Sequence, residues 1–125
     1  MFDEKVNARQ REIYEEIQRK QSKIVRRIDV VEHAKIVRRE LKEKFPEIKF
    51  RVRSDRFAGG DSVTAYHVGE ITKEQQREVI EFVRKFNGFA GDLMDGRYNV
   101  GFMYNDERIA GATFCRYNHR YPWAK

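Results

Sequence analysis

Apolar residues recur at helical spacing over the first 45 residues of the chain. From residue 3 to residue 28 they follow one another at steps of seven and four, which is typical of a narrow stripe along one face of a helix. The stripe consists of Val6, Ile13, Ile17, Ile24 and Ile28. Because neither Gly nor Pro occurs before Pro46, the pattern predicts one long helix, and a break near residues 21–23 is compatible with it.

A second helix is expected directly after the first. Asp29 followed by Glu32 is a capping-box pattern, so the helix should begin at Val30. Its apolar stripe comprises Val30, Ala34, Val37 and Leu41. Pro46 should end it just beyond Phe45, because the residue before a proline disfavours the helical conformation.

Two segments with strictly alternating polarity follow, at about 47–54 and 62–68. Alternation is typical of strands with one buried face. In the first strand it points Ile48, Phe50 and Val52 inward and Lys49, Arg51 and Arg53 outward. The glycine-containing corner between the strands predicts a turn.

The rest of the chain predicts one more helix and two more strands. Thr72 with Gln75 marks the helix start, and Val79, Ile80, Val83 and Phe86 form its apolar stripe. Residues 89–99 contain two glycines and are expected to form a loop, followed by strands at 98–104 and 108–117 around a turn at 105–107. This order predicts an α+β fold, with a small antiparallel sheet of about four strands and helices packed on one face. We expect an N-terminal helical extension at 1–28 and the α+β domain at 29–125.

Composition narrows the class of protein. The chain has 125 residues, of which 37% are charged and 13% aromatic, so a folded domain is expected rather than disorder. No apolar run is long enough to cross a membrane, the N-terminus lacks the apolar stretch of a signal peptide, and the single Cys115 has no disulfide partner. These features favour the cytoplasm, which would be the host cytoplasm for a mobile-element protein, with no membrane association.

The net charge of +6 is concentrated at the two ends of the chain. Residues 1–45 carry 13 Lys and Arg against 9 Asp and Glu, and residues 108–125 carry 4 against none. The middle segment has a slight acidic excess, with 9 against 11. A basic surplus permits binding to a polyanion without establishing it.

Lys49, Arg51 and Arg53 are the first candidate for such binding. Alternate residues of a strand lie about 6.6 Å apart, a spacing comparable to that of phosphates along an extended single strand. If Val63 and Ala65 face the core, Tyr66 shares the outer face with the three cations. Cations beside an aromatic ring on an open sheet resemble platforms for single-stranded nucleic acid. The alternatives are an ordinary solvated face, or a face covered by the N-terminal helix.

Two further segments could bind anions. The C-terminal stretch interleaves cations and aromatics without an acid, and its candidate residues are Arg116, Tyr117, Arg120 and Tyr121. Tyr121 or Trp123 could instead pack on the core. The corner at 56–62, with Arg56, could offer backbone N–H groups to a phosphate, although a turn that requires positive φ explains its glycines without a ligand.

Residues suited to catalysis are few. His33, His67 and His119 are scattered, and only the weak Cys115-x-x-x-His119 spacing hints at a metal site. A Walker loop, a dinucleotide fingerprint and a nucleophile elbow are all missing from the sequence. We therefore expect a non-enzymatic protein without cofactor, metal or catalytic residues, with Cys115 as a small core residue.

Three segments together resemble a known family. They are the run from Phe45 to Asp55, the run from Ala58 to Val63, and Phe114-Cys115-Arg116-Tyr117. The chain is similar over roughly residues 30–121 to large polyvalent protein-associated domain 29, a module of phage and mobile-element proteins. Where the family usually has Trp and then Thr-Asp-Gly-Pro, this chain has His67 and a rebuilt turn. The resemblance implies a mobile-element origin and an accessory role against host defences, with no catalytic residues.

These features suggest a non-enzymatic accessory protein that binds nucleic acid or a host nucleoprotein defence complex, acting in counter-defence as anti-CRISPR proteins do. Two alternatives remain: a protein–protein inhibitor of a host enzyme without nucleic-acid contact, and a nucleotide-binding protein or enzyme using the Gly59-Gly60 corner. The N-terminal helix could also support a homodimer.

Overall fold

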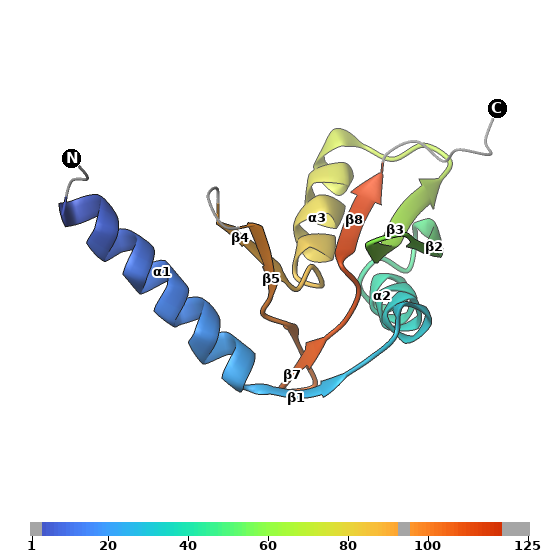
Figure 1. Ribbon diagram of the computed structural model, residues 1–125. Helices are drawn as coiled ribbons and strands as arrows, with labels where there is room; N and C mark the ends of the chain where they lie inside the picture. Colours follow the sequence, from blue (N-terminus) through green and yellow to red (C-terminus); the bar gives the residue numbers. More distant parts are fainter. Residues whose placement is uncertain (1–3, 93–95, 119–125) are drawn as a thin grey trace.

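The computed structural model describes residues 4–92 and 96–118, and Figure 1 shows how they are arranged. Helix α1 projects from one end of the molecule, and α2 and α3 lie with the larger sheet at the other end. In chain order the elements are α1 (Glu4–Ser22), β1 (Ile24–Arg27), α2 (Val30–Lys44), β2 (Lys49–Phe57), β3 (Gly60–Val68), α3 (Lys73–Arg84), β4 (Phe89–Asp92), β5 (Gly96–Asn99), β6 (Phe102–Tyr104), β7 (Glu107–Ala110) and β8 (Phe114–Asn118).

The α+β class is confirmed, but the sheet is not the single antiparallel one that the sequence suggested. The described strands form two three-stranded sheets, ordered β2-β3-β8 and β1-β7-β6, and the hairpin β4-β5. Each three-stranded sheet is mixed, because β3 pairs with β8 in parallel and β1 pairs with β7 in parallel. The run expected as one strand at 108–117 breaks at residues 111–113, so its two halves join different sheets.

Helices α2 and α3 cover one face of the β2-β3-β8 sheet, as expected. Helix α2 packs on β2 and β3, and α3 packs on β8. Val37, Leu41, Val63 and Val79 of these elements are fully buried, and Ile109 of β7 belongs to the same core cluster. The predicted stripe of α2 is buried in the core, and so are Val79, Val83 and Phe86 of the α3 stripe, whereas Ile80 is only partly buried.

The helix starts follow the cap residues in the sequence. The Asp29 side chain accepts a hydrogen bond from the Glu32 N–H, and Thr72 and Gln75 form a reciprocal capping box. The predicted box at Asp29 is only half formed, because the Glu32 carboxylate pairs with Arg26 instead.

Two segments adopt structures that local patterns did not indicate. Residues 24–27 continue the helical stripe in sequence, yet they form β1, in which Ile24, Arg26 and Arg27 pair with β7 and the β-branched Ile24 and Val25 suit an extended backbone. Helix α1 ends at Ser22, at the break that the sequence allowed. The expected loop at 89–99 contains the hairpin strands β4 and β5, with residues 93–95 outside the description.

His33 is a polar residue at the centre of the core, with 0% of its surface exposed. Its Nδ1 accepts a hydrogen bond from the Ala112 N–H at 2.9 Å, and its Nε2–H donates to the Phe86 carbonyl at 3.0 Å. The imidazole also stacks on Phe102, with ring centroids 4.7 Å apart. One side chain of α2 thus holds the end of α3, the segment before β8, and β6.

Both nitrogens of His33 are used by the neutral ring, and burial lowers the pKa of His33 to about 4. The unfolded chain has a histidine pKa near 6.5. As pH falls from 6.5 towards 4, the unfolded state binds a proton that the folded state does not, so stability falls with pH in this window.

We predict that His33→Ala lowers the free energy of unfolding at pH 7.5 by about 2–4 kcal/mol, through the cavity and two lost hydrogen bonds. Urea unfolding at pH 7.5 and pH 4.5 measures this. Between pH 7.5 and pH 4.5, the free energy of unfolding should fall by up to about 3 kcal/mol more in the wild-type protein than in the variant. Equal acid sensitivity in both proteins would contradict the role of His33.

Gly111 leaves room for the same imidazole. A Cβ at this position would lie 2.5 Å from His33 Nδ1, closer than real Cβ atoms come to any neighbour. We predict that Gly111→Ala lowers the unfolding midpoint in urea because the ring must shift from both of its partners. In the His33→Ala background the same substitution should cost much less. If the two losses of stability simply add in the double mutant, the strain caused by Gly111→Ala does not come from contact with His33.

Candidate nucleic-acid interface

The face of the β2-β3-β8 sheet opposite the helices carries most of the predicted binding residues. The register places Arg51 opposite Tyr66, and Arg53 opposite Thr64. On the other side of β3, Arg116 lies beside Thr64. Residues that pair across strands point to the same face, and adjacent strands lie about 4.8 Å apart. Cations on β2 and β8 therefore flank the central strand.

This face is strongly positive. Lys49, Arg51, Arg53 and Arg116 are exposed. Among the described residues of these three strands that point outward, Asp55 is the single acid, and it pairs with Arg53 at 3.0 Å. Both members of that pair are nearly half exposed, so water screens their attraction.

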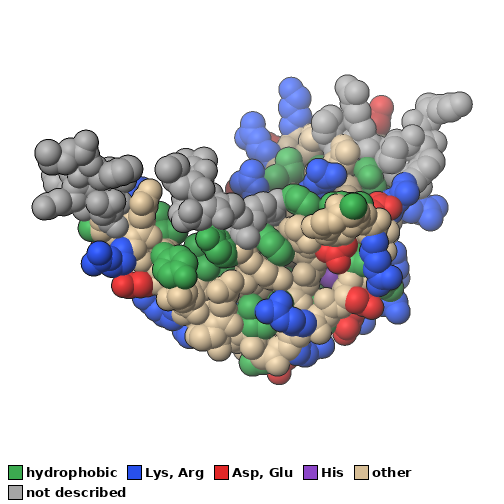
Figure 2. Space-filling view, in the orientation of Figure 1, with side chains coloured by type: hydrophobic (Ala, Val, Ile, Leu, Met, Phe, Trp, Pro, Cys, Tyr) green, Lys and Arg blue, Asp and Glu red, His purple; other side chains and the backbone are tan. Residues whose placement is uncertain are grey.

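Helix α1 does not cover this face. In Figure 1 it projects from the far end of the molecule, away from β2 and β3. Figure 2 shows Lys and Arg side chains, with some acidic groups between them, along the side where β2 and β3 lie. Of the alternatives considered from sequence, coverage by the N-terminal helix is therefore wrong.

The central strand contributes less surface than the sequence suggested. Tyr66 does lie on the outer face with the cations, but only 8% of its surface is exposed. Ser62 and Thr64 on the same strand are also buried. Tyr66 thus offers little ring area for stacking a base, and the exposed groups of this face come mainly from β2 and β8.

Phe57 is the exposed aromatic residue of this face, and it was not among the residues predicted from the sequence. It lies at the end of β2 with 48% of its surface exposed, and its ring centroid is 6.1 Å from that of Phe114 on β8. Residue 57 is an even number of positions from Lys49, Arg51 and Arg53, so strict alternation places it on the same face of the strand. Extending the first strand three residues further would have found it.

The other predicted site residues lie elsewhere. Arg56 points to the opposite face of the sheet, where its guanidinium is 3.9 Å from the Asp29 carboxylate at the start of α2. Tyr117 is also on that face, half-buried, and its hydroxyl contacts His67 Nδ1. Burial raises the pKa of Tyr117 to about 12. Arg120 and Tyr121 lie outside the described residues.

The turn between β2 and β3 explains why a glycine occurs at this corner. Gly59 has φ of +90°, a conformation that L side chains rarely adopt, and the two-residue turn brings Phe57 opposite Gly60. The positive φ accounts for Gly59 without a bound phosphate.

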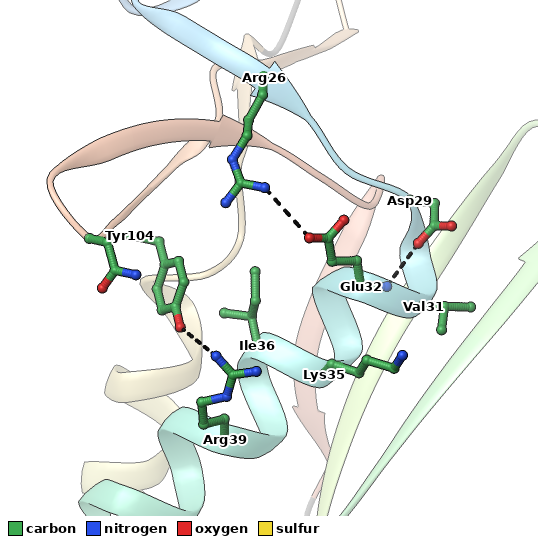
Figure 3. Close-up of a pocket in the computed structure, with 9 residues that line it drawn as sticks. Arg26, Asp29, Val31, Glu32, Lys35, Ile36, Arg39 and Tyr104 are labelled. Carbon is green, nitrogen blue, oxygen red and sulfur yellow. Dashed lines mark hydrogen bonds and ion pairs between the residues drawn. The ribbon is translucent and has the colours of Figure 1, made fainter.

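A separate pocket of about 530 Å³ lies between α2, β1 and the β6–β7 turn (Figure 3). Arg26, Lys35 and Arg39 line it, together with the carboxylates of Asp29 and Glu32. Arg26 is 3.5 Å from Glu32 and 3.7 Å from Glu107, so two acids already neutralise it. The pocket is thus closer to charge balance than the sheet face, and it makes a weaker anion site.

The described residues give little support for a metal site or a reactive cysteine. Among residues 4–92 and 96–118, no three His, Cys, Asp or Glu side chains gather in a way that could hold a metal ion. Cys115 is buried, as predicted, and burial raises the pKa of its thiol to about 12, so it is a poor nucleophile. No helix in the described part of the chain is both long and apolar enough to span a membrane.

Comparison with known proteins places the chain in a family. The family model described as large polyvalent protein associated domain 29 matches residues 28–121. No curated protein and no solved structure matches the chain. The matched range runs from the end of β1 to just beyond β8, so it contains the whole β2-β3-β8 sheet and both helices packed on it.

Proposed function

Because the chain belongs to the large polyvalent protein associated domain 29 family, and so is a phage- or mobile-element-associated protein, we propose that it binds single-stranded nucleic acid through the outer face of its β2-β3-β8 sheet. Four exposed cations on one sheet face, with a single acid among the described outward residues, are the observation that carries this proposal. The protein acts without catalysis.

The cations would contact phosphates, and Phe57 would stack on a base. Lys49, Arg51 and Arg53 follow β2 at alternate positions, so an extended strand of nucleic acid can pass along them. Arg116 on β8 is about two strand spacings, or roughly 10 Å, from Arg53. Phosphate contacts of this kind give affinity without sequence preference.

A nucleic-acid strand exposed in a host defence complex is the target that best suits a mobile-element protein. Occupying such a strand in the host cytoplasm would block the complex and so serve counter-defence, as anti-CRISPR proteins do. A protein–protein inhibitor of a host enzyme is the second candidate, and the apolar exposed surface of Phe57 favours it. Pull-down from host lysate with and without nuclease separates the two, because only a direct protein contact survives digestion.

We predict that fluorescein-labelled single-stranded DNA and RNA of about 20 nucleotides bind the protein at low salt. Three or four phosphate contacts give a log–log salt slope of roughly −2 to −3. The double variant Arg51→Glu with Arg116→Glu should weaken binding at least about tenfold and flatten this slope. Fluorescence anisotropy at several salt concentrations measures both effects.

The double variant Lys73→Glu with Arg77→Glu is the matched control, since both residues are exposed on α3, which packs on the other face of the sheet. It makes the same change in net charge and should leave binding nearly unchanged. Equal weakening by this control would mean that net charge alone drives association. Absence of binding at low salt would remove the nucleic-acid proposal.

A further inference from the structure

The register of the β2–β3 hairpin determines which backbone groups of β2 face outward from the sheet. A two-residue turn joins the strands, with Phe57 opposite Gly60, so this closing pair exchanges hydrogen bonds. Hydrogen-bonded and non-hydrogen-bonded pairs then alternate. Residues 49, 51, 53, 55 and 57 bond to β3, whereas residues 50, 52, 54 and 56 direct their N–H and C=O groups to the opposite edge.

An independent contact supports this assignment. Arg38 of α2 donates a hydrogen bond to the Val52 carbonyl at 3.0 Å, so that carbonyl accepts from outside the β2–β3 ladder. In the described sheet the order is β2-β3-β8, with no strand beyond β2. The edge is nine residues long, and long open edges are templates for pairing with another chain.

A pocket of about 400 Å³ lies at the start of this edge. Pro46, Ile48 and Phe50 give it apolar walls, and the cations Arg38, Lys42 and Lys49 surround them. A side chain that projects from an added strand could enter this space. Backbone pairing beside a side-chain pocket is the arrangement by which sheet edges recognise extended peptides.

The charged residues around this edge indicate what kind of segment could bind there. Glu47 is the one acid that lines the pocket, against three cations, and along β2 the cations Lys49, Arg51, Arg53 and Arg56 outnumber the single acid Asp55, which pairs with Arg53. Two copies of β2 placed edge to edge would bring these cations together, which disfavours self-pairing. We propose that the open edge of β2 binds an extended acidic peptide segment of a partner protein as an added strand, with one apolar side chain of that segment in the pocket.

This surface is distinct from the one proposed for nucleic acid. Strand addition uses the backbone of residues 50, 54 and 56 and the N–H of Val52, whose carbonyl already accepts from Arg38, whereas nucleic acid would use side chains on the outer face. Lys49 borders both surfaces, because it lines the pocket and is one of the four cations of the face. Either activity can be lost without the other.

Amide hydrogen exchange followed by NMR tests the proposal. The probe is an end-capped nine-residue peptide of alternating Glu and Val with a central Leu. In the free protein the amides of Phe50, Ser54 and Arg56 should exchange faster than those of Arg51 and Arg53, which bond to β3. The peptide should slow the first group at least tenfold and leave the second group unchanged.

Two matched peptides separate strand addition from charge attraction. N-methylation of every second peptide nitrogen removes the hydrogen bonds without changing charge, and it should abolish binding. Replacing each Glu by Lys should abolish it as well. Lys42→Glu in the protein should weaken binding at least fivefold, whereas Lys73→Glu at the start of α3, an exposed site that does not line the pocket, should not.

Three outcomes would overturn the proposal. Retained binding of the N-methylated peptide would indicate ionic contact alone. Chemical-shift changes at Arg51, Arg53 and Arg116 without slower exchange at the edge would place the peptide on the outer face. Absence of binding at about 1 mM peptide would indicate that the cations only guard the edge against aggregation.

Discussion

The buried imidazole of His33 is the contact on which the arrangement of this domain depends. Helix propensity and apolar stripes can form α2 and α3, but they do not fix how these helices meet the strands that follow. Two hydrogen bonds and one ring stack from His33 join α2 to the end of α3, to the segment before β8 and to β6. A buried polar group with both partners in place favours one arrangement over others, because any alternative leaves the group unsatisfied.

The position of β8 links this core contact to the surface. Strand β8 pairs with β3 in parallel, and this pairing places Arg116 level with Arg53 across the sheet. Parallel neighbours that are distant in sequence need a crossover, which here runs through α3, the hairpin β4-β5 and the strands β6 and β7. The positive face is thus a product of tertiary structure, with cations contributed from both ends of the domain.

Local sequence signals predicted the parts of the fold that depend on short-range chemistry. The caps at Asp29 and Thr72, the stripes of α2 and α3, and the parity of Lys49, Arg51 and Arg53 all follow from neighbouring residues. The strand at 24–27 and the break at 111–113 could not be predicted, because pairing with β7 and contact with His33 decide them. The low exposure of Tyr66 also depends on tertiary surroundings, whereas strand parity alone could have indicated Phe57.

The short strand β1 has a mechanical consequence for helix α1. Helix α1 leads directly into β1, so tension applied through α1 loads the hydrogen bonds that pair β1 with β7. The Ile28 N–H bond to the Ala110 carbonyl, 2.8 Å long, passes this load to the residue next to Gly111. A displacement of α1 is therefore transmitted to the backbone two residues before Ala112, whose N–H is bonded to the buried ring of His33.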